Sequence, residues 1–216
     1  MKRKSFWISA VVLVVPVVIF YFLSSGVQNY KKLPILGVKI PPDGNHQKDT
    51  LFYTIPDFQV WDQTGKALTQ ASFNDRIYVA NFFFASCKND CATMNRRLSQ
   101  VYEKYIEFTE VQFISFSMDP NNDSIPVLAN YAKKYKANSN IWHFVNVKNE
   151  SLYSLQKGFL LPVSTVELAP NHYRQLVLVD KQNRIRGIYD SDSEADVLQL
   201  QDDLKVLLYE YHQPGL

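Results

Sequence analysis

The chain has 216 residues and a mass of 25.0 kDa, which is enough for one well-buried domain with an anchor but not for two full domains. Hydrophobic residues make up 46% of it and aromatic residues 14%, and this composition excludes a disordered chain. The 23 basic residues are nearly balanced by 21 acidic ones, and no concentrated basic face stands out. Nucleic acid is therefore not expected as a partner.

The first residues have the pattern of a membrane anchor. The basic residues 2–4 precede an apolar run over residues 6–23 that carries no charged side chain. About twenty apolar residues can cross the hydrocarbon core of a bilayer, and basic residues before the span keep the N-terminus in the cytoplasm. We predict a single-pass transmembrane helix within residues 1–25, in a bacterial inner membrane, with the rest of the chain on the periplasmic or extracytoplasmic side. A cleaved signal peptide, with residues 24–26 as its exit, is the alternative.

Residues 26–50 are expected to be a tether, because prolines and glycines are scattered among polar residues without a sustained period. The folded domain is predicted to cover residues 51–216. We expect this domain to fold as a soluble monomer without the first fifty residues.

Within the domain, buried strands alternate with amphipathic helices. Apolar runs predict strands at residues 58–61, 67–68, 77–84, 111–116, 141–147, 176–180 and 185–189. Helical periods predict helices at residues 91–106, 124–135, 150–157 and 193–211. This order, with a hairpin and a helix at the end, is typical of an α/β thioredoxin-like fold, in which helices flank a central mixed sheet.

The only two cysteines of the chain, Cys87 and Cys91, follow the strand at residues 77–84 and enter the next helix. In open α/β sheets, sites gather beyond the carboxyl ends of the strands, and a helix N-terminus favours the thiolate form of cysteine. A disulfide that closes so short a loop would restrict the unfolded chain very little. The pair is better explained by chemistry, either disulfide exchange or the binding of a soft metal ion.

Several landmarks in the domain resemble one known family. They are the stretches IPDF and DQTG at residues 55–58 and 62–65, the Cys87-x-x-x-Cys91 motif, SMDP at residues 117–120, and Asn171-His172 ahead of LVLVD at residues 176–180. Together the landmarks resemble the Sco/SenC proteins, copper chaperones for assembly of the Cu(A) centre of cytochrome c oxidase. The resemblance covers nearly the whole domain.

The resemblance implies a ligand set and a partner. Cys87, Cys91 and His172 would bind copper as Cu(I) or Cu(II), and the partner would be the cytochrome c oxidase subunit that carries the Cu(A) site, or another copper acceptor. Family members usually have proline after each motif cysteine and aspartate before the histidine. This chain has Lys88, Ala92 and Asn171 there, so its copper affinity or redox behaviour is expected to depart from the family pattern.

Other candidate ligands are weaker. His46 and His212 lie in the tether and the tail, and His143 lies in a predicted strand, where a structural role is expected. Met94 has helical spacing from Cys91, which favours core packing over a thioether ligand. Asp119 and Asp123 follow a strand and are interpreted as a turn and a helix start, with a role in orienting the site as the alternative.

Two other functions remain open. The chain would be a binding and transfer protein without a turnover reaction if it carries copper. It would instead be a thiol-disulfide reductase if Cys87 attacks a partner's disulfide and Cys91 resolves the product. A peroxide-reducing relative is disfavoured, because the threonine and arginine that accompany a peroxidatic cysteine are not found at the expected spacings.

Overall fold

The computed structural model describes residues 12–21, 32–37, 52–87, 90–147, 149–161 and 174–212. The chain divides into two compact units, Met1–Lys31 and Lys32–Leu216. In the first unit, residues 12–21 are helical and exposed. Among the described residues, no helix is long and apolar enough to cross a membrane. The predicted anchor extends over residues 1–25, most of which lie outside the described residues.

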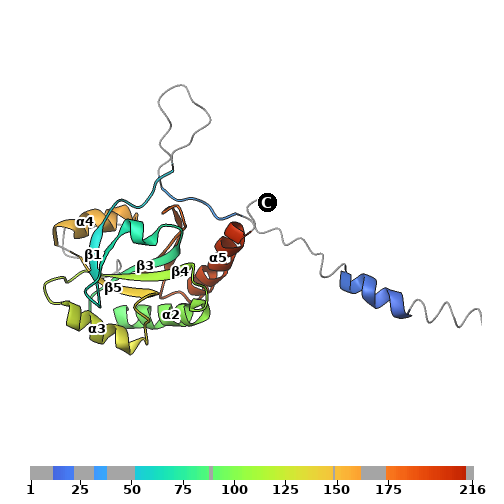
Figure 1. The fold of residues 1–216 in the computed structure, drawn as a ribbon, viewed down its shortest axis with the longest axis horizontal. Coiled ribbons are helices and arrows are strands. Elements are labelled where there is room, and N and C mark those ends of the chain that lie inside the picture. The colour runs from blue at the N-terminus through green and yellow to red at the C-terminus, as the bar shows by residue number, and fades with distance from the viewer. Residues whose placement is uncertain are drawn as a thin grey trace, which may run out of the picture. The chain divides into compact units, whose positions relative to one another are not determined.

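A single sheet of seven strands forms the centre of the second unit (Figure 1). Its strands, in the spatial order β2-β1-β5-β4-β3-β6-β7, are β1 (Gln59–Asp62), β2 (Ala67–Thr69), β3 (Ile77–Phe83), β4 (Val111–Ser117), β5 (Trp142–Asn146), β6 (Gln175–Val179) and β7 (Ile185–Asp190). The three central strands β3, β4 and β5 are parallel, whereas the pairs β1–β2, β1–β5, β3–β6 and β6–β7 are antiparallel. The predicted mixed sheet is confirmed.

Helices cover both faces of this sheet. They are α2 (Asp90–Tyr105), α3 (Ile125–Lys134), α4 (Asn149–Gly158) and α5 (Glu194–His212), with a short 3-10 helix, η1 (Gln70–Phe73), that was not predicted. In Figure 1, α2 and α3 lie on one side of the sheet and α4 on the other. Helix α5 packs on β7 and also contacts α2.

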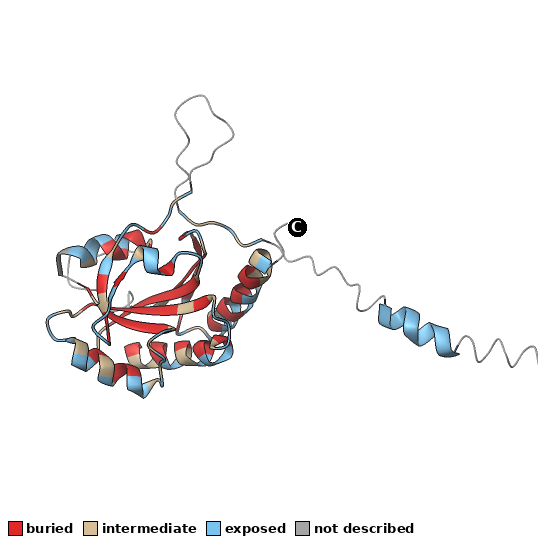
Figure 2. Ribbon diagram, in the orientation of Figure 1, coloured by how far each residue is buried: buried red, intermediate tan, exposed pale blue. Residues whose placement is uncertain are grey.

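The burial of β3 in the core explains why its sequence is a nearly continuous apolar run. All seven residues of β3 are buried, since helices cover the sheet above and below. The strands of the central sheet accordingly stand out as buried in Figure 2, whereas the outer faces of the helices are exposed. Stacked aromatic side chains fill much of this core, for example Trp142 on Phe144 with ring centroids 4.9 Å apart.

Part of the predicted tether lies along the domain. The Leu36 N–H donates to the Ile185 carbonyl over 2.8 Å, at the outer edge of the sheet. The guanidinium of the buried Arg186 donates to the carbonyl oxygens of Leu33 (2.8 Å) and Pro34 (3.2 Å). We call residues 32–37 the strap. The boundary at residue 51 stays a prediction, but these contacts place the strap on the domain.

Arg186 can hold the strap because its own charge is compensated. Its guanidinium pairs with the fully buried Asp180 at 2.9 Å and with Glu210 of α5 at 2.9 Å. A buried arginine needs such partners, since an unpaired charge in the interior is very unfavourable. The strap ends at Gly37. Its φ of +105° is a backbone conformation that residues with a side chain rarely adopt, and a Cβ atom at this position would clash with the Tyr53 side chain.

Candidate metal centre

The two cysteines lie where a central parallel strand ends. β3 stops at Phe83, and the chain turns so that the Cys87 N–H donates to the Phe84 carbonyl over 3.1 Å. α2 then begins at Asp90, one residue before Cys91. The neighbouring strand β4 is attached at the same edge, because the Met118 N–H donates to the Phe83 carbonyl over 2.7 Å. Both sulfurs are therefore carried to the carboxyl edge of the sheet, as predicted.

The two thiols differ in their surroundings. Both are free in the structure; Cys91 is buried and Cys87 is only partly so. The Cys91 N–H donates to the Cys87 sulfur over 3.3 Å. Burial, followed by the hydrogen bond to Cys87, raises the pKa of the Cys91 thiol to about 12, against a smaller opposing effect from the Phe84 backbone. At Cys91, desolvation of the charged form therefore opposes the thiolate that a helix N-terminus is expected to favour.

Asp123 does more than begin a helix. Its side chain is buried, and its Oδ2 accepts hydrogen bonds from the Ala85 N–H (3.0 Å) and the Ser117 hydroxyl (2.6 Å). Ala85 belongs to the turn that carries Cys87, so this carboxylate fastens the cysteine turn to the end of β4. Asp123 lies before the start of α3 as expected, and it also has the orienting role that the sequence left as the alternative. Because its contact with Ala85 joins residues 38 positions apart, no local sequence pattern predicts this contact.

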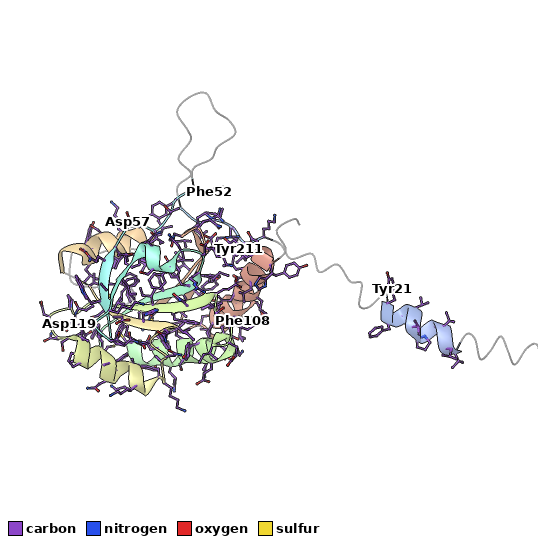
Figure 3. The ribbon with its side chains drawn as sticks, viewed as in Figure 1. Tyr21, Phe52, Asp57, Phe108, Asp119 and Tyr211 are labelled. Atoms are coloured by element: carbon purple, nitrogen blue, oxygen red, sulfur yellow. The ribbon has the colours of Figure 1, made fainter. Side chains whose placement is uncertain are left out.

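Asp119 is the turn residue that the sequence predicted. Its carbonyl accepts from the N–H groups of Asn122 (3.0 Å) and Asp123 (2.8 Å). Its carboxylate binds the exposed Asn122 amide, and the residue lies at the surface beside α3 (Figure 3).

A buried polar network lies beneath the cysteine helix. The Asn81 amide of β3 donates to Asn95 of α2 over 2.8 Å and accepts from the Ser115 hydroxyl over 2.6 Å. Asn95 in turn donates to the Tyr131 hydroxyl of α3 over 3.1 Å. This network fixes α2 against the sheet one turn after Cys91. Sequence reasoning missed it, although a lone asparagine inside an apolar strand, as at Asn81, is a signal that could have found it.

Met94 and two of the histidines, His143 and His212, can be compared with their predicted roles. Met94 is fully buried, and its sulfur faces the Asn81 amide at 3.6 Å, so core packing is confirmed. His143 is buried with its Nδ1 3.5 Å from an Asp62 carboxylate oxygen, and burial lowers the pKa of its imidazole. That nitrogen has no hydrogen bond, so His143 is structural but incompletely paired. His212 is exposed and contacts Glu110 at 2.7 Å, and His46 lies outside the described residues.

His172, the third predicted ligand, also lies outside the described residues, as does Asn171. Arg174, however, is described, and its side chain reaches the start of the cysteine helix. The guanidinium of Arg174, two residues after His172, lies 3.3 Å from the carboxylate of Asp90, the first residue of α2. Within the part of the chain that the structure describes, no group of three or more His, Cys, Asp or Glu side chains is arranged for a metal ion.

Comparison with known proteins identifies the family. The family model described as SCO1/SenC matches residues 46–207. The chain belongs to the SCO1/SenC family. A curated relative, the SCO1 protein homolog of Bacillus subtilis (strain 168), is 30% identical over 109 residues, which cover 50% of this chain and 56% of that protein. The chain thus matches little more than half of that relative's length.

Solved structures support the fold. One is BsSco, described as having a disulfide switch and as a member of the Sco family of cytochrome c oxidase assembly proteins. It has a TM-score of 0.62 and 24% identity, over 73% of this chain and 95% of that one. Another is Arabidopsis thaliana ScoI with copper bound, with a TM-score of 0.59 and 18% identity, over 72% and 98%. The predicted thioredoxin-like α/β fold is confirmed.

Proposed function

We propose that this chain is a membrane-anchored copper metallochaperone that holds Cu(I) or Cu(II) through Cys87, Cys91 and His172. The observation that carries the proposal is the pair of free thiols at the carboxyl edge of the sheet, with the Cys91 N–H on the Cys87 sulfur. The contact between Arg174 and Asp90 supports the third ligand. Arg174 follows His172 by two residues, and two extended residues span at most about 7 Å.

The donor set fits copper. Two thiolates are soft ligands and favour Cu(I), whereas a neutral imidazole as third ligand makes Cu(II) acceptable. A closed zinc site usually has four protein ligands, and the chain has only two cysteines to offer. Because Cys87 is partly exposed and Cys91 is buried, Cys87 is the sulfur that an acceptor protein can reach first during transfer.

The Cu(A) site of cytochrome c oxidase is the proposed destination. Family membership supports it, as does the description of BsSco as a member of a family of oxidase assembly proteins. For a membrane-bound acceptor, the apolar residues 6–23 would keep the chaperone at the same membrane. We place residues 1–25 in a bacterial inner membrane, with the N-terminus cytoplasmic and the domain on the outer side.

A thiol-disulfide reductase is the second candidate, and the unequal cysteines favour it. Cys87 as thiolate would attack a partner's disulfide and release one partner thiol. Cys91 would then break the mixed disulfide, so that two electrons pass to the partner and a Cys87–Cys91 disulfide remains. Oxidation removes two copper ligands, and the two functions can therefore belong to one protein.

Copper binding by the reduced second unit, residues 32–216, tests the proposal. We expect one copper per domain, measured by metal analysis, with a visible absorption from thiolate bound to Cu(II). His172→Ala should weaken Cu(II) binding about tenfold to a hundredfold, which is the usual effect of replacing a residue that supports a metal site. The same substitution should weaken Cu(I) binding less. Cys87→Ser or Cys91→Ser should damage both states. His143→Ala is the matched control, since His143 lies 3.5 Å from Asp62 within the core.

Two outcomes would contradict the proposal. If His172→Ala leaves the Cu(II) spectrum and affinity unchanged while His143→Ala abolishes them, the ligand assignment is wrong. If the single variants of all three ligands keep copper while the cysteine variants lose disulfide exchange, the reductase function replaces the chaperone.

A further inference from the structure

Four exposed basic side chains lie on α2 and at the end of α3. They are Arg96 on α2, Lys133 and Lys134 in the last turn of α3, and Lys136 just beyond it. None of the four forms an ion pair with an acidic residue in the described ranges of the chain. The two helices lie on the same side of the sheet, and their outer surfaces are exposed (Figure 1, Figure 2). We call these four residues the basic face.

The near balance of charge over the whole chain does not show this surface. Residues 124–149 contain no Asp or Glu. The acids of α2 closest in sequence to Arg96 are Asp90 and Glu103, which lie about two helical turns away. Acidic residues gather instead in residues 190–203, which contain six of them and no basic residue. The sequence indicated no concentrated basic face because Arg96 and the lysines belong to different helices.

The basic face borders the strand end from which the cysteine turn begins. The Lys134 ammonium lies 5.1 Å from the centre of the Tyr131 ring. That ring stacks on Phe83, the last residue of β3, with ring centroids 4.9 Å apart. The Tyr131 ring thus links Lys134 to the end of β3, four residues before Cys87.

Tyr135, between the lysines, lies near both Arg96 and the cysteines. Its hydroxyl donates to the Tyr131 hydroxyl over 3.3 Å. Burial raises the pKa of the Tyr135 hydroxyl, and among the smaller effects both cysteines raise it and Arg96 lowers it. The two sulfurs and the Arg96 guanidinium are therefore within electrostatic range of one hydroxyl. The basic face and the candidate metal centre are neighbours.

Lys136 has a backbone conformation that does not favour lysine. Its N–H donates to the Lys133 carbonyl over 3.2 Å, and the Ala137 N–H donates to the Ala132 carbonyl over 3.3 Å. These are the two hydrogen bonds of a Schellman motif, which ends α3. The motif places Lys136 at a φ of +51°, where glycine or asparagine is usual. The end of the helix therefore does not explain why a lysine stands here.

We propose that the basic face docks an acidic surface of the protein that comes to the cysteines. Opposite charges speed the encounter of two proteins and orient them, and these four charges are free to do so. The exposed Val127 in the first turn of α3 and the half-buried Tyr135 add apolar contact area. Tyrosine and arginine are enriched at protein interfaces, which favours a protein over a lipid surface as the partner. The inference rests on the proposed function in one respect, since chaperone and reductase both need a partner at Cys87.

Binding to the metal-free soluble Cu(A) domain of cytochrome c oxidase tests the proposal. The copper-free full chain is held in nonionic detergent, and calorimetry measures the Kd at about 20 and 200 mM salt. We expect the affinity of the wild type to fall at least about tenfold at the higher salt, because salt screens exposed charges. Replacing Lys133, Lys134 and Lys136 together by Glu should weaken binding at low salt about tenfold or more and should nearly abolish the salt dependence.

A second triple variant is the matched control. Lys66→Glu, Lys157→Glu and Lys205→Glu change the net charge equally, at exposed sites on the β1–β2 turn, α4 and α5. This variant should change the affinity less than about threefold. Equal effects of the two triple variants would show that only net charge matters, and absence of binding by the wild type would show that the face does not dock this partner. Either result overturns the proposal.

Lys136→Gly separates docking from a role in the fold. Glycine suits the φ of +51°, so the melting temperature of the full chain should stay the same or rise. The affinity for the Cu(A) domain should fall about threefold, because one charge of the face is lost. A lower melting temperature with unchanged affinity would assign Lys136 to the fold and would count against the proposal.

An anionic lipid surface is distinguished by reconstitution. The chain is placed in nanodiscs of phosphatidylcholine, with or without phosphatidylglycerol, and hydrogen exchange is followed over α3. Slower exchange with phosphatidylglycerol, lost in the triple variant of the basic face and not accompanied by binding of the Cu(A) domain, would make the partner a lipid and overturn the proposal.

The inference and the proposed function fail separately, because docking is measured without copper. Loss of the inference alone would leave copper bound to the reduced domain, with docking that is indifferent to the basic face. Failure of copper binding would leave the salt-dependent docking in place, as a reductase also requires.

Discussion

The sulfur of Cys91 is buried at the start of α2, whereas Cys87 precedes the helix and is partly exposed. Burial raises the pKa of Cys91 to about 12, so at neutral pH this thiol stays protonated until a metal ion or a disulfide bond replaces its proton. In either proposed function, Cys87 is then the residue that meets the partner first, and Cys91 completes the reaction.

Alkylation of the reduced protein should reveal this difference. Because only thiolate reacts, and because the pKa of Cys91 lies well above pH 8, iodoacetamide at pH 8 should modify Cys87 about a hundredfold faster or more. Peptide mapping by mass spectrometry measures both rates. In denaturant the two rates should converge, which serves as the control. Equal rates in the folded protein would show that Cys91 is neither shielded nor held protonated.

The turn that carries Cys87 is held by a neighbouring loop. Asp123 accepts hydrogen bonds from Ala85 in this turn and from Ser117 at the end of β4. The Asn146 amide of β5 donates to the carbonyl oxygens of Pro120 (3.0 Å) and Asp123 (2.8 Å), and so fixes the loop itself. The β4–α3 loop is in this way a support for the cysteine turn.

Asp123→Ala should therefore disturb both stability and the cysteines. It leaves the Ala85 N–H and the buried Ser117 hydroxyl without their acceptor, and we expect the free energy of unfolding to fall by about 2–3 kcal/mol in urea titrations. The difference between the alkylation rates of Cys87 and Cys91 should shrink at the same time. Asp119→Ala is the control, since it removes only an exposed contact with Asn122 and should cost less than about 0.5 kcal/mol. Equal effects of the two variants would mean that Asp123 does not support the turn.

The second unit begins at Lys32, and the strap is its first segment. Leu33 and Leu36 pack against the core, and Arg186 binds the strap through two carbonyl oxygens. These contacts hold residues 32–37, which the sequence assigned to the tether, on the domain.

Chains that begin at residue 32 and at residue 51 should both fold, but with different stability. The shorter chain lacks the Leu36–Ile185 hydrogen bond and the carbonyl partners of Arg186, and we expect it to lose about 2 kcal/mol of unfolding free energy. Its melting temperature should be lower by about 4–8 °C, measured by circular dichroism. Leu36→Pro in the longer chain removes one N–H donor and should give part of this loss. Identical melting temperatures would show that the strap is not part of the folded unit.

The order of helices and strands could be predicted from the sequence because the signals are local. The apolar run over residues 77–84 and the helical period over residues 91–106 each lie within one segment, and the structure has β3 and α2 there. The spacing of Cys87 and Cys91 is equally local, so the two sulfurs could be placed between the end of a strand and the first turn of a helix. The short helix η1 was missed because its four residues carry no period.

What the sequence by itself determined is the succession of elements and the position of the two thiols along it, since periodicity and spacing act between near neighbours. Only the tertiary structure decided which of these thiols is buried, that Asp123 holds the cysteine turn, and that Arg174 meets Asp90 and Arg186 meets the strap. Burial and hydrogen bonding of this kind join residues that lie 38, 84 and 153 positions apart. Such contacts exist only after the sheet has assembled, because the packing of the whole domain brings the partners together.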